Sequence, residues 1–413
     1  MKLRGLLAII VLATSFLVTT PAEAKNQPED FFSVDSISEI KITISEGSAG
    51  KLARAPKVAV PARFEMRNKS GSVNYNNVPV DFKLKGTSTL RQNPSLTSSR
   101  PSLRVKFRED GAIPLQSVGG MKSLTLNAMT TDGSKIHEYT SYKLYNAMNI
   151  PAPRVGYAQV TVVIGSRTYD KGLFAIIEPY DDLFLEKRFQ SPTQHLYEPC
   201  DHWTDVTKPG ASKGGADCVN AVFEVKEGWK STPNKLDLRA LSSIQKLPNQ
   251  ADWWLAMDRY TDRDQFIRMW AVDNFISAWD SYSGSIINNY YLRSDGMGVF
   301  TMMPTGTDET FSFNYEMDAR SIGYPLIYTD FQIQSKSRGI MFTKCLNYKP
   351  CRNQYLDELK AVRAKAKEIK LTKQVLAISK TLNDAPTWAQ LAVNNWIAMK
   401  GQEVDLLLRK YGR

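Results

Sequence analysis

The spacing of hydrophobic residues changes near residue 180, and this change constrains the fold more than any other feature of the sequence. Before it, short runs alternate apolar with polar residues, a pattern typical of half-buried β-strands. After it, apolar residues recur at helical spacing, most clearly over 262–280 and 356–413. The sequence therefore predicts an α+β fold with two lobes, a β-rich N-terminal lobe over 37–180 and a mainly helical C-terminal lobe over 181–413.

Individual elements follow from the same patterns. Strands are expected over 37–47, 57–66, 102–109 and 121–129, a strand–turn–strand unit over 73–86, and hairpins over 154–180 and within 279–311. Helices are expected over 134–148 and from residue 181 onward. Polar composition predicts loops over 87–101 and 312–340, and an irregular, disulfide-pinned insertion near 190–250.

The first 24 residues have the composition of a secretory signal peptide. Lys2 and Arg4 precede an apolar run over 6–18, and Ala22-Glu23-Ala24 forms a small-residue cleavage site. The run is shorter than the roughly 18 apolar residues that span a membrane. We therefore expect cleavage after Ala24, a loose leader over 25–36, and an exported protein, secreted or held in the periplasm or cell envelope, without an integral membrane segment.

The chain is basic, with a formal net charge of +11, and 42% of its residues are hydrophobic, enough for a substantial core. Positive charge favours acidic partners such as nucleotides or an acidic envelope component. A solvated lysine-rich surface is the alternative explanation, and no pattern indicates specific nucleic-acid binding. The charge alone does not choose among these partners.

Four cysteines and three histidines narrow the chemistry. In an oxidising compartment the four cysteines are expected to form disulfides, and neighbour pairing of Cys200 with Cys218 and of Cys345 with Cys351 is the simplest of three connectivities. A zinc site is disfavoured because no CxxC pair is present. So few histidines also argue against catalysis by a Ser-His-Asp or Cys-His arrangement.

A phosphate-binding loop is one interpretation of residues 84–92. Gly86 and the hydroxyl of Ser88 follow a predicted strand, where backbone N–H groups can approach a phosphate, and Lys85 adds charge. In the next strand, Arg104 and Lys106 alternate with apolar residues and so share one face, as a phosphate-holding lysine of a kinase would. The alternatives are a flexible polar loop and a strand with a basic outer face.

Glu178 ends an apolar strand just before Pro179, at the expected crossing between the lobes. In a two-lobe kinase, a carboxylate at this place would meet the adenine or pair with a strand lysine. The alternative is an ordinary carboxylate at the end of a strand.

The hairpin within 279–311 carries acidic and amide side chains at both ends. Protein kinases use an Asp to accept the proton of the substrate hydroxyl, then an Asn and a second Asp to bind Mg²⁺ across the phosphates of ATP. Asp280, then Asn288 or Asn289, then Asp308 supply these side chains in that order. Mg²⁺ needs only one or two carboxylates besides phosphate and water. A surface hairpin with polar ends is the alternative.

Five blocks, taken together and in order, resemble the CotH family of secreted atypical protein kinases. They are KLKGTSTLR, RPSLRVKF, KSLTLNAM with the helix and strand that follow it, KGLFAIIEPYDDLFL and WDSYSGSIINNYYL, which span about residues 80–312. The resemblance implies a kinase-like fold, ATP with Mg²⁺ or Mn²⁺, and transfer of the γ-phosphate to a hydroxyl of a protein substrate, the chain itself included.

Carried over onto this chain, the resemblance makes Asp280 the catalytic residue and Asp308 the metal ligand, with Asn289 or Asn288 as its amide partner. The family's W-D-x-D motif reads Thr305-Gly306-Thr307-Asp308 here, so one acidic residue and the Trp are missing. This departure supports a second interpretation, a catalytically weak or inactive envelope binding, scaffold or adhesin protein. A third is transfer of another group, such as an amino acid, from an ATP-activated intermediate.

Overall fold

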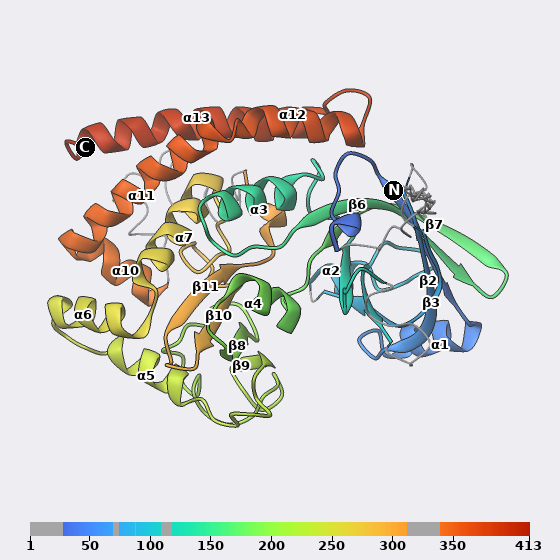
Figure 1. Ribbon diagram of the computed structural model, residues 1–413, viewed down its shortest axis with the longest axis horizontal. Helices are drawn as coiled ribbons and strands as arrows, with labels where there is room; N and C mark the ends of the chain where they lie inside the picture. The colour runs from blue at the N-terminus through green and yellow to red at the C-terminus, as the bar shows by residue number, and fades with distance from the viewer. Residues whose placement is uncertain (1–27, 69–73, 87, 109–117, 312–338) are drawn as a thin grey trace, which may run out of the picture.

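The N-terminal half of the protein folds into a closed seven-stranded barrel (Figure 1). The computed structural model describes residues 28–68, 74–86, 88–108, 118–311 and 339–413. The barrel order is β1-β2-β3-β4-β5-β7-β6, in which β1 and β6 pair in parallel and the other neighbours are antiparallel. Its strands are β1 (Ser38–Ile44), β2 (Val60–Arg67), β3 (Asn74–Lys85), β4 (Ser102–Phe107), β5 (Ser123–Asn127), β6 (Val155–Ile164) and β7 (Arg167–Ile177).

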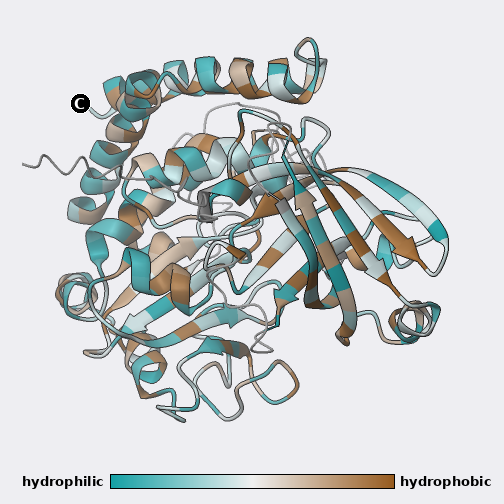
Figure 2. Cartoon of the chain, turned by 45° about the vertical axis from the view of Figure 1, so that its right-hand side comes forward, coloured by the Kyte–Doolittle hydropathy of each residue, from teal (hydrophilic) through white to brown (hydrophobic). Residues whose placement is uncertain are grey.

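Alternation along these strands fills the barrel with apolar side chains. In β3 and β4, for example, Phe82, Leu84, Leu103 and Val105 are buried in one core cluster, and the residues between them lie on the outer face. Figure 2 shows the resulting change between hydrophobic and hydrophilic residues along the strands. The outer face of β3 and β4 is therefore free to carry the basic residues that the sequence places there.

A second, four-stranded antiparallel sheet lies in the C-terminal half, in the order β11-β10-β8-β9. Its strands are β8 (Thr193–Pro199), β9 (Phe223–Glu227), β10 (Tyr290–Asp295) and β11 (Phe300–Pro304). The hairpin β10–β11 confirms the one expected within 279–311. The region 190–250 is not simply irregular, because β8 and β9 pair across it and complete the sheet.

Helices form the rest of this half. The most extensive contact between two described helices joins α7 (Arg263–Ile276) to α11 (Lys349–Glu368). Helices α12 (Leu371–Leu382) and α13 (Trp388–Lys410) run along one side of this half (Figure 1). The shorter helices are α4 (Asp182–Arg188), α5 (Leu236–Ile244), α6 (Gln250–Tyr260) and α10 (Ile340–Asn347). The mixed α+β fold, with its β-rich part followed by a mainly helical part, confirms the predicted fold class.

Helix α3 (His137–Ala147) links the two halves. It lies between β5 and β6 in the sequence, yet Tyr142, Leu144 and Tyr145 belong to the core cluster of the helical half. It packs against α7, α11 and α12 (Figure 1). Because α3 is almost wholly buried, its first turn is held rigidly where the two halves meet.

Three local expectations differ from the structure. Within the strand–turn–strand unit expected over 73–86, Asn74–Lys85 form one strand, β3, because Asn77 adopts a left-handed conformation (φ 53°) in a bulge opposite β2 and does not reverse the chain. Helices α1 (Glu46–Arg54) and α2 (Ser88–Gln92) occupy segments expected to be extended or loop. The expected loose leader is ordered from the short helix η1 (Pro28–Phe31), where Phe31 stacks on Tyr75 in the barrel core.

Both predicted disulfides are present, Cys200–Cys218 and Cys345–Cys351. The first lies in the segment between β8 and β9, and the second joins α10 to α11. Of the described residues, no helix combines the length and hydropathy needed to cross a membrane. The predicted signal peptide and most of the predicted loop at 312–340 lie outside the described residues.

Candidate active site

Asp280 lies in the turn between α7 and β10, and an amide from the start of β10 holds its side chain. Asn289 Nδ2 donates to Asp280 Oδ2 at 2.6 Å and to the carbonyl oxygen of Gly306 at 3.0 Å. Asn288 Nδ2 in turn donates to Asn289 Oδ1 at 3.2 Å. The amide of Asn289 therefore joins Asp280 to the Gly306 segment at the base of the hairpin.

A buried carboxylate on α7, that of Asp273, holds the turn that carries Asp280. Asp273 accepts hydrogen bonds from Tyr145 Oη at 2.5 Å and from Ser283 Oγ at 2.8 Å, three residues beyond Asp280. Burial raises the pKa of Asp273 to about 6, although both hydroxyl contacts oppose the rise. Helix α7 thus fixes the backbone that carries Asp280.

Asp308 follows β11 in the short helix η3 (Thr307–Glu309). The hydroxyl of Thr131 donates to Asp308 Oδ2, and the ring of His137 contacts the Asp308 carbonyl oxygen. Further along, the backbone N–H of Phe311 donates to the carbonyl of Ile276 on α7. The Asp308 segment is therefore held by α3 and its preceding loop on one side and by α7 on the other.

A buried carboxylate that the sequence reasoning missed, Glu138, comes from the first turn of α3. Asn127 at the end of β5 donates to it at 2.7 Å. Burial raises the pKa of Glu138 to about 8, Asp308 adds to the rise, and Lys85 opposes it. A lysine at the end of a strand facing a glutamate on the helix between the lobes is the arrangement that protein kinases use to hold ATP phosphates.

The carboxylates of the site repel one another. Burial raises the pKa of Asp280 to about 8, with Asp308 and then Glu309 adding to the effect. The pKa of Glu309 is also raised, first by burial and then by Asp308. Glu138, Asp280, Asp308 and Glu309 thus form a shared acidic cluster between the two halves of the protein, in which added positive charge is favoured.

The basic residues of the barrel face are spread along it. Lys85 pairs with Ser102 at one end of the β3–β4 ladder, next to Asn127, whereas Lys106 pairs with Asp81 four residues further along β4. Four residues of strand span about 13 Å. Lys85 accordingly lies with the acidic cluster, and the exposed Lys106 lies away from it.

Arg104 occupies the middle of this face. Its guanidinium donates to Ser123 Oγ at 3.1 Å. Burial raises the pKa values of Asp181 and Tyr291, and the charge of Arg104 opposes both rises. It therefore faces the junction between the halves, beside the second sheet. A phosphate group bound at Lys85 would have Arg104 and its cross-strand neighbour Lys83, rather than Lys106, as the next cations along the strand face.

Gly86 connects β3 to α2 with a positive φ of 111°. A Cβ atom there would lie 2.5 Å from Thr89 Oγ1, so a side chain is excluded by both space and backbone conformation. Ser88 begins α2, and its side chain lies outside the described residues. Helix α2 thus occupies much of the segment that was expected to be a phosphate-binding or flexible loop.

Glu178 lies at the crossing between the halves, and two arginines hold its carboxylate. Arg154 Nη2 and Arg188 Nη2 each lie 2.7 Å from it. These partners keep the pKa of Glu178 below its usual range in spite of its burial. Pairing with a strand lysine, one of the two roles expected from the sequence, is therefore not observed, and we assign Glu178 to holding β7 against α4.

The donors at the base of the hairpin fit a magnesium ion that shares its ligands with phosphate. Among the described residues, no group of three or more His, Cys, Asp or Glu side chains is arranged to hold a metal ion by itself. Asp280, Asn289 and Asp308 offer only oxygen ligands, and Mg²⁺ is commonly held by one or two carboxylates together with phosphate oxygens and water. The chemistry of the site thus matches a nucleotide-borne divalent cation.

A two-lobed protein with a strand lysine, a helix glutamate and a hairpin bearing two aspartates belongs to the kinase-like class. The family model described as CotH kinase protein matches residues 82–398. The chain therefore belongs to this family, which confirms the resemblance seen in the sequence.

Among solved structures, the chain is similar to the crystal structure of a Helicobacter pylori proinflammatory kinase, CtkA, with 10% sequence identity and a TM-score of 0.36. The match covers 74% of this chain and 93% of that one. No curated protein matches the chain.

Proposed function

We propose that the protein is an exported, metal-dependent kinase that transfers the γ-phosphate of ATP to a hydroxyl group of a protein. The observation that carries the proposal is the convergence of Asp280, Asn289 and Asp308 at the base of one hairpin, opposite Lys85 and Glu138 from the barrel side. Two disulfides are consistent with an oxidising compartment outside the cytosol.

Each residue has a role in this reaction. Asp280 accepts the proton of the acceptor hydroxyl as its oxygen forms a bond to the γ-phosphorus and the bond to the ADP oxygen breaks. Its raised pKa, about 8, suits a base that works near neutral pH. Asn289 orients Asp280 through the 2.6 Å hydrogen bond. Lys85, whose charge acts on the nearby Glu138, binds phosphate oxygens.

Asp308 and Asn289 are the residues that would hold Mg²⁺ or Mn²⁺. When bound, the ion neutralises phosphate charge and orients the γ-phosphate. It would also relieve the repulsion among Asp280, Asp308 and Glu309, whose pKa effects on one another show how closely their charges act. Catalysis then rests on positioning and charge neutralisation, with little covalent chemistry for the protein to perform.

A second candidate function is a binding or scaffold role in the cell envelope with little or no catalysis. Gly306 favours it, because the acidic residue that the family motif carries there is absent. The retained Asp280 and Asp308 favour the enzyme.

Thermal unfolding with ATP, Mg²⁺ and Mn²⁺, alone and in combination, tests the proposal. We expect the full stabilisation, about 2.7 kcal/mol at a ligand concentration 100 times Kd, only when nucleotide and metal are both present, and a smaller one with ATP alone. Asp308→Ala should abolish it, and Asp384→Ala, an exposed carboxylate between α12 and α13, should not. No stabilisation of the wild-type protein under any condition would leave the binding protein as the better account.

A further inference from the structure

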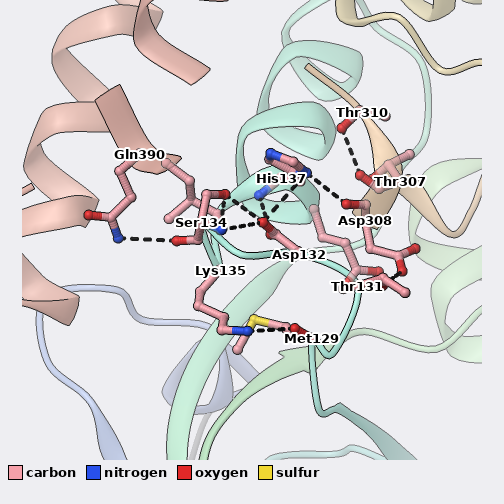
Figure 3. A network of polar contacts seen from close by, with 12 residues as sticks. Met129, Thr131, Asp132, Ser134, Lys135, His137, Thr307, Asp308, Thr310 and Gln390 are labelled. Carbon is pink, nitrogen blue, oxygen red and sulfur yellow. Dashed lines mark hydrogen bonds and ion pairs between the residues drawn. The ribbon is translucent and has the colours of Figure 1, made fainter. Parts of the chain in front are cut away.

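The loop between β5 and α3 and the first residue of α3 each contact Asp308 (Figure 3). Thr131 donates its hydroxyl to the carboxylate oxygen Oδ2. His137 Nδ1 lies 2.7 Å from the main-chain carbonyl oxygen of the same residue. One contact thus occupies an oxygen that a metal ion would need, while the other leaves both carboxylate oxygens free.

The state of the imidazole follows from its partners. A carbonyl oxygen can only accept, so His137 Nδ1 carries the hydrogen and donates it. Asp132 Oδ1 lies 3.5 Å from the same nitrogen, and Asp132 Oδ2 accepts from the backbone N–H of His137 at 2.9 Å. Asp132 therefore holds the backbone of His137 and lies beside the ring nitrogen that donates to Asp308.

Asp132 is itself fixed. Its side chain is buried, and Oδ1 accepts from Ser134 twice, from the backbone N–H at 2.8 Å and from Oγ at 2.6 Å. Gln390 on α13 donates to the carbonyl of Ser134 at 3.1 Å (Figure 3). A chain of hydrogen bonds therefore runs from the C-terminal helix through Asp132 and His137 to the backbone of Asp308.

The residues that follow Asp308 also contact α3. The His137 ring packs on Phe311, with 5.7 Å between ring centroids, and Thr310 Oγ1 lies 3.2 Å from Ser141 Oγ one turn further along the helix. Asp308 thus lies in a segment whose backbone is fixed from one face of α3. Glu138 follows His137 in the helix. The first turn of α3 therefore places both the contact of His137 with the Asp308 backbone and the carboxyl group of Glu138 in the acidic cluster.

We propose that His137 is a positioning residue, which fixes the backbone of Asp308 so that its carboxylate can bind a metal–nucleotide complex. The inference rests on the proposed function. Since His137 touches Asp308 only at its main-chain carbonyl oxygen, this contact can persist when a metal displaces Thr131 from the carboxylate. His137 therefore acts on metal affinity through Asp308, and not by touching nucleotide or metal.

The test compares two substitutions of similar size. His137→Met fills the volume without a donor, whereas His137→Gln keeps an N–H group that can donate to the carbonyl. His202→Ala, at an exposed loop histidine, is the control. The measurements are the apparent affinity for Mn²⁺ at saturating ATP, the affinity for ATP without metal, and hydrogen exchange of the amides of 305–311 in the metal-free protein.

We expect His137→Met to weaken Mn²⁺ binding about 10- to 100-fold, the effect typical of an outer residue that orients a metal ligand. Metal-free ATP binding should change less than twofold, exchange over 305–311 should accelerate, and His137→Gln should recover most of the Mn²⁺ affinity. Equal loss of both affinities in both variants would show a merely structural role and overturn the inference, as would unchanged Mn²⁺ affinity in His137→Met.

The proposed function fails in a different way. If the wild-type protein binds no ATP with any metal, the kinase proposal is wrong and the metal-positioning role is overturned with it. If the wild-type protein binds and His137→Met binds equally well, only the inference about His137 is overturned.

Discussion

Gly306 stands where the family motif has an acidic residue, and the structure predicts that putting one back is harmful. Gly306 has φ +56°, and a Cβ atom built on it would lie 2.6 Å from Asn289 Oδ1. Asn289 is also the residue whose amide donates to Asp280 and to the Gly306 carbonyl. Any side chain at 306 must therefore displace the amide that orients Asp280.

The magnitude follows from two contributions. The left-handed backbone costs an L-residue about 1–2 kcal/mol. In a titration at about pH 9, above the raised pKa of Asp280, losing the hydrogen bond from Asn289 to the ionised Asp280 carboxylate adds about 1.5–3 kcal/mol, the range for bonds to charged groups. Gly298→Ala is the matched control, because Gly298 has φ +77° in the turn of the same hairpin and a Cβ there meets only Asp237 Cβ, at 3.9 Å.

Urea unfolding of the metal-free protein measures the difference. We expect a loss of about 1–2 kcal/mol for Gly298→Ala and about 3–5 kcal/mol for Gly306→Ala. Gly306→Asp should lose at least as much, since its charge joins the acidic cluster, and should bind Mn²⁺–ATP more weakly than wild type. Equal losses at the two glycines, or tighter Mn²⁺–ATP binding by Gly306→Asp, would refute this reasoning.

Three more results are expected. Burial raises the pKa of Asp280 to about 8, so this group stays protonated in the folded state at pH values where it ionises in the unfolded chain. The free energy of unfolding of the metal-free protein should therefore fall as pH rises from about 4 to about 8, by up to ~1.4 kcal/mol per pH unit from this group. Asp280→Asn should flatten that slope in urea titrations. Glu178→Gln leaves two arginines without their carboxylate and should cost about 3–5 kcal/mol while changing the Kd for ATP less than twofold by calorimetry. Replacing Cys200 and Cys218 by serine opens a loop with a sequence separation of 18 and should cost about 3 kcal/mol, read from thermal unfolding beside the oxidised wild type.

Features that depend on neighbouring residues were predictable from the sequence. The hairpin β10–β11, the barrel hairpin β6–β7 and helix α7 follow from hydrophobic period and turn residues, so their positions could be read directly. Asp280, Asn289 and Asp308 are joined by that one hairpin, and their proximity followed from its local geometry. The cysteines pair with their neighbours for the same reason: each pair closes a short stretch of chain.

Features set by distant contacts were not predictable in this way. Glu138 reads as an ordinary helix residue, and only the packing of α3 into the helical half brings it to Lys85 and Asp308. Strands β8 and β9 are short and lie in polar surroundings, and they are recognisable only once β10 pairs with β8. An Asn at the end of β5 followed by a helix with an acidic first turn is the local signal that would have pointed to Glu138.

Lys106 and Glu178 show the limit of arguments from a shared face. Lys106 does share the outer face of β4 with Arg104, but alternation does not say how far along the strand the site lies. Glu178 does end a strand at the crossing between the halves, but Arg154 and Arg188, from separate segments, take up its carboxylate. In both cases the residue type and face were right for the chemistry, and tertiary placement decided the role.

Transfer of labelled phosphate from ATP tests the central claim most directly. Purified mature protein would be incubated with γ-labelled ATP and Mg²⁺ or Mn²⁺, with and without an added protein acceptor, beside Asp280→Asn. The account predicts metal-dependent label on protein hydroxyl groups, reduced about 100-fold or more in Asp280→Asn, the contribution typical of a catalytic base. Equal labelling by Asp280→Asn, or no transfer by a wild-type protein that binds metal and ATP, would contradict it.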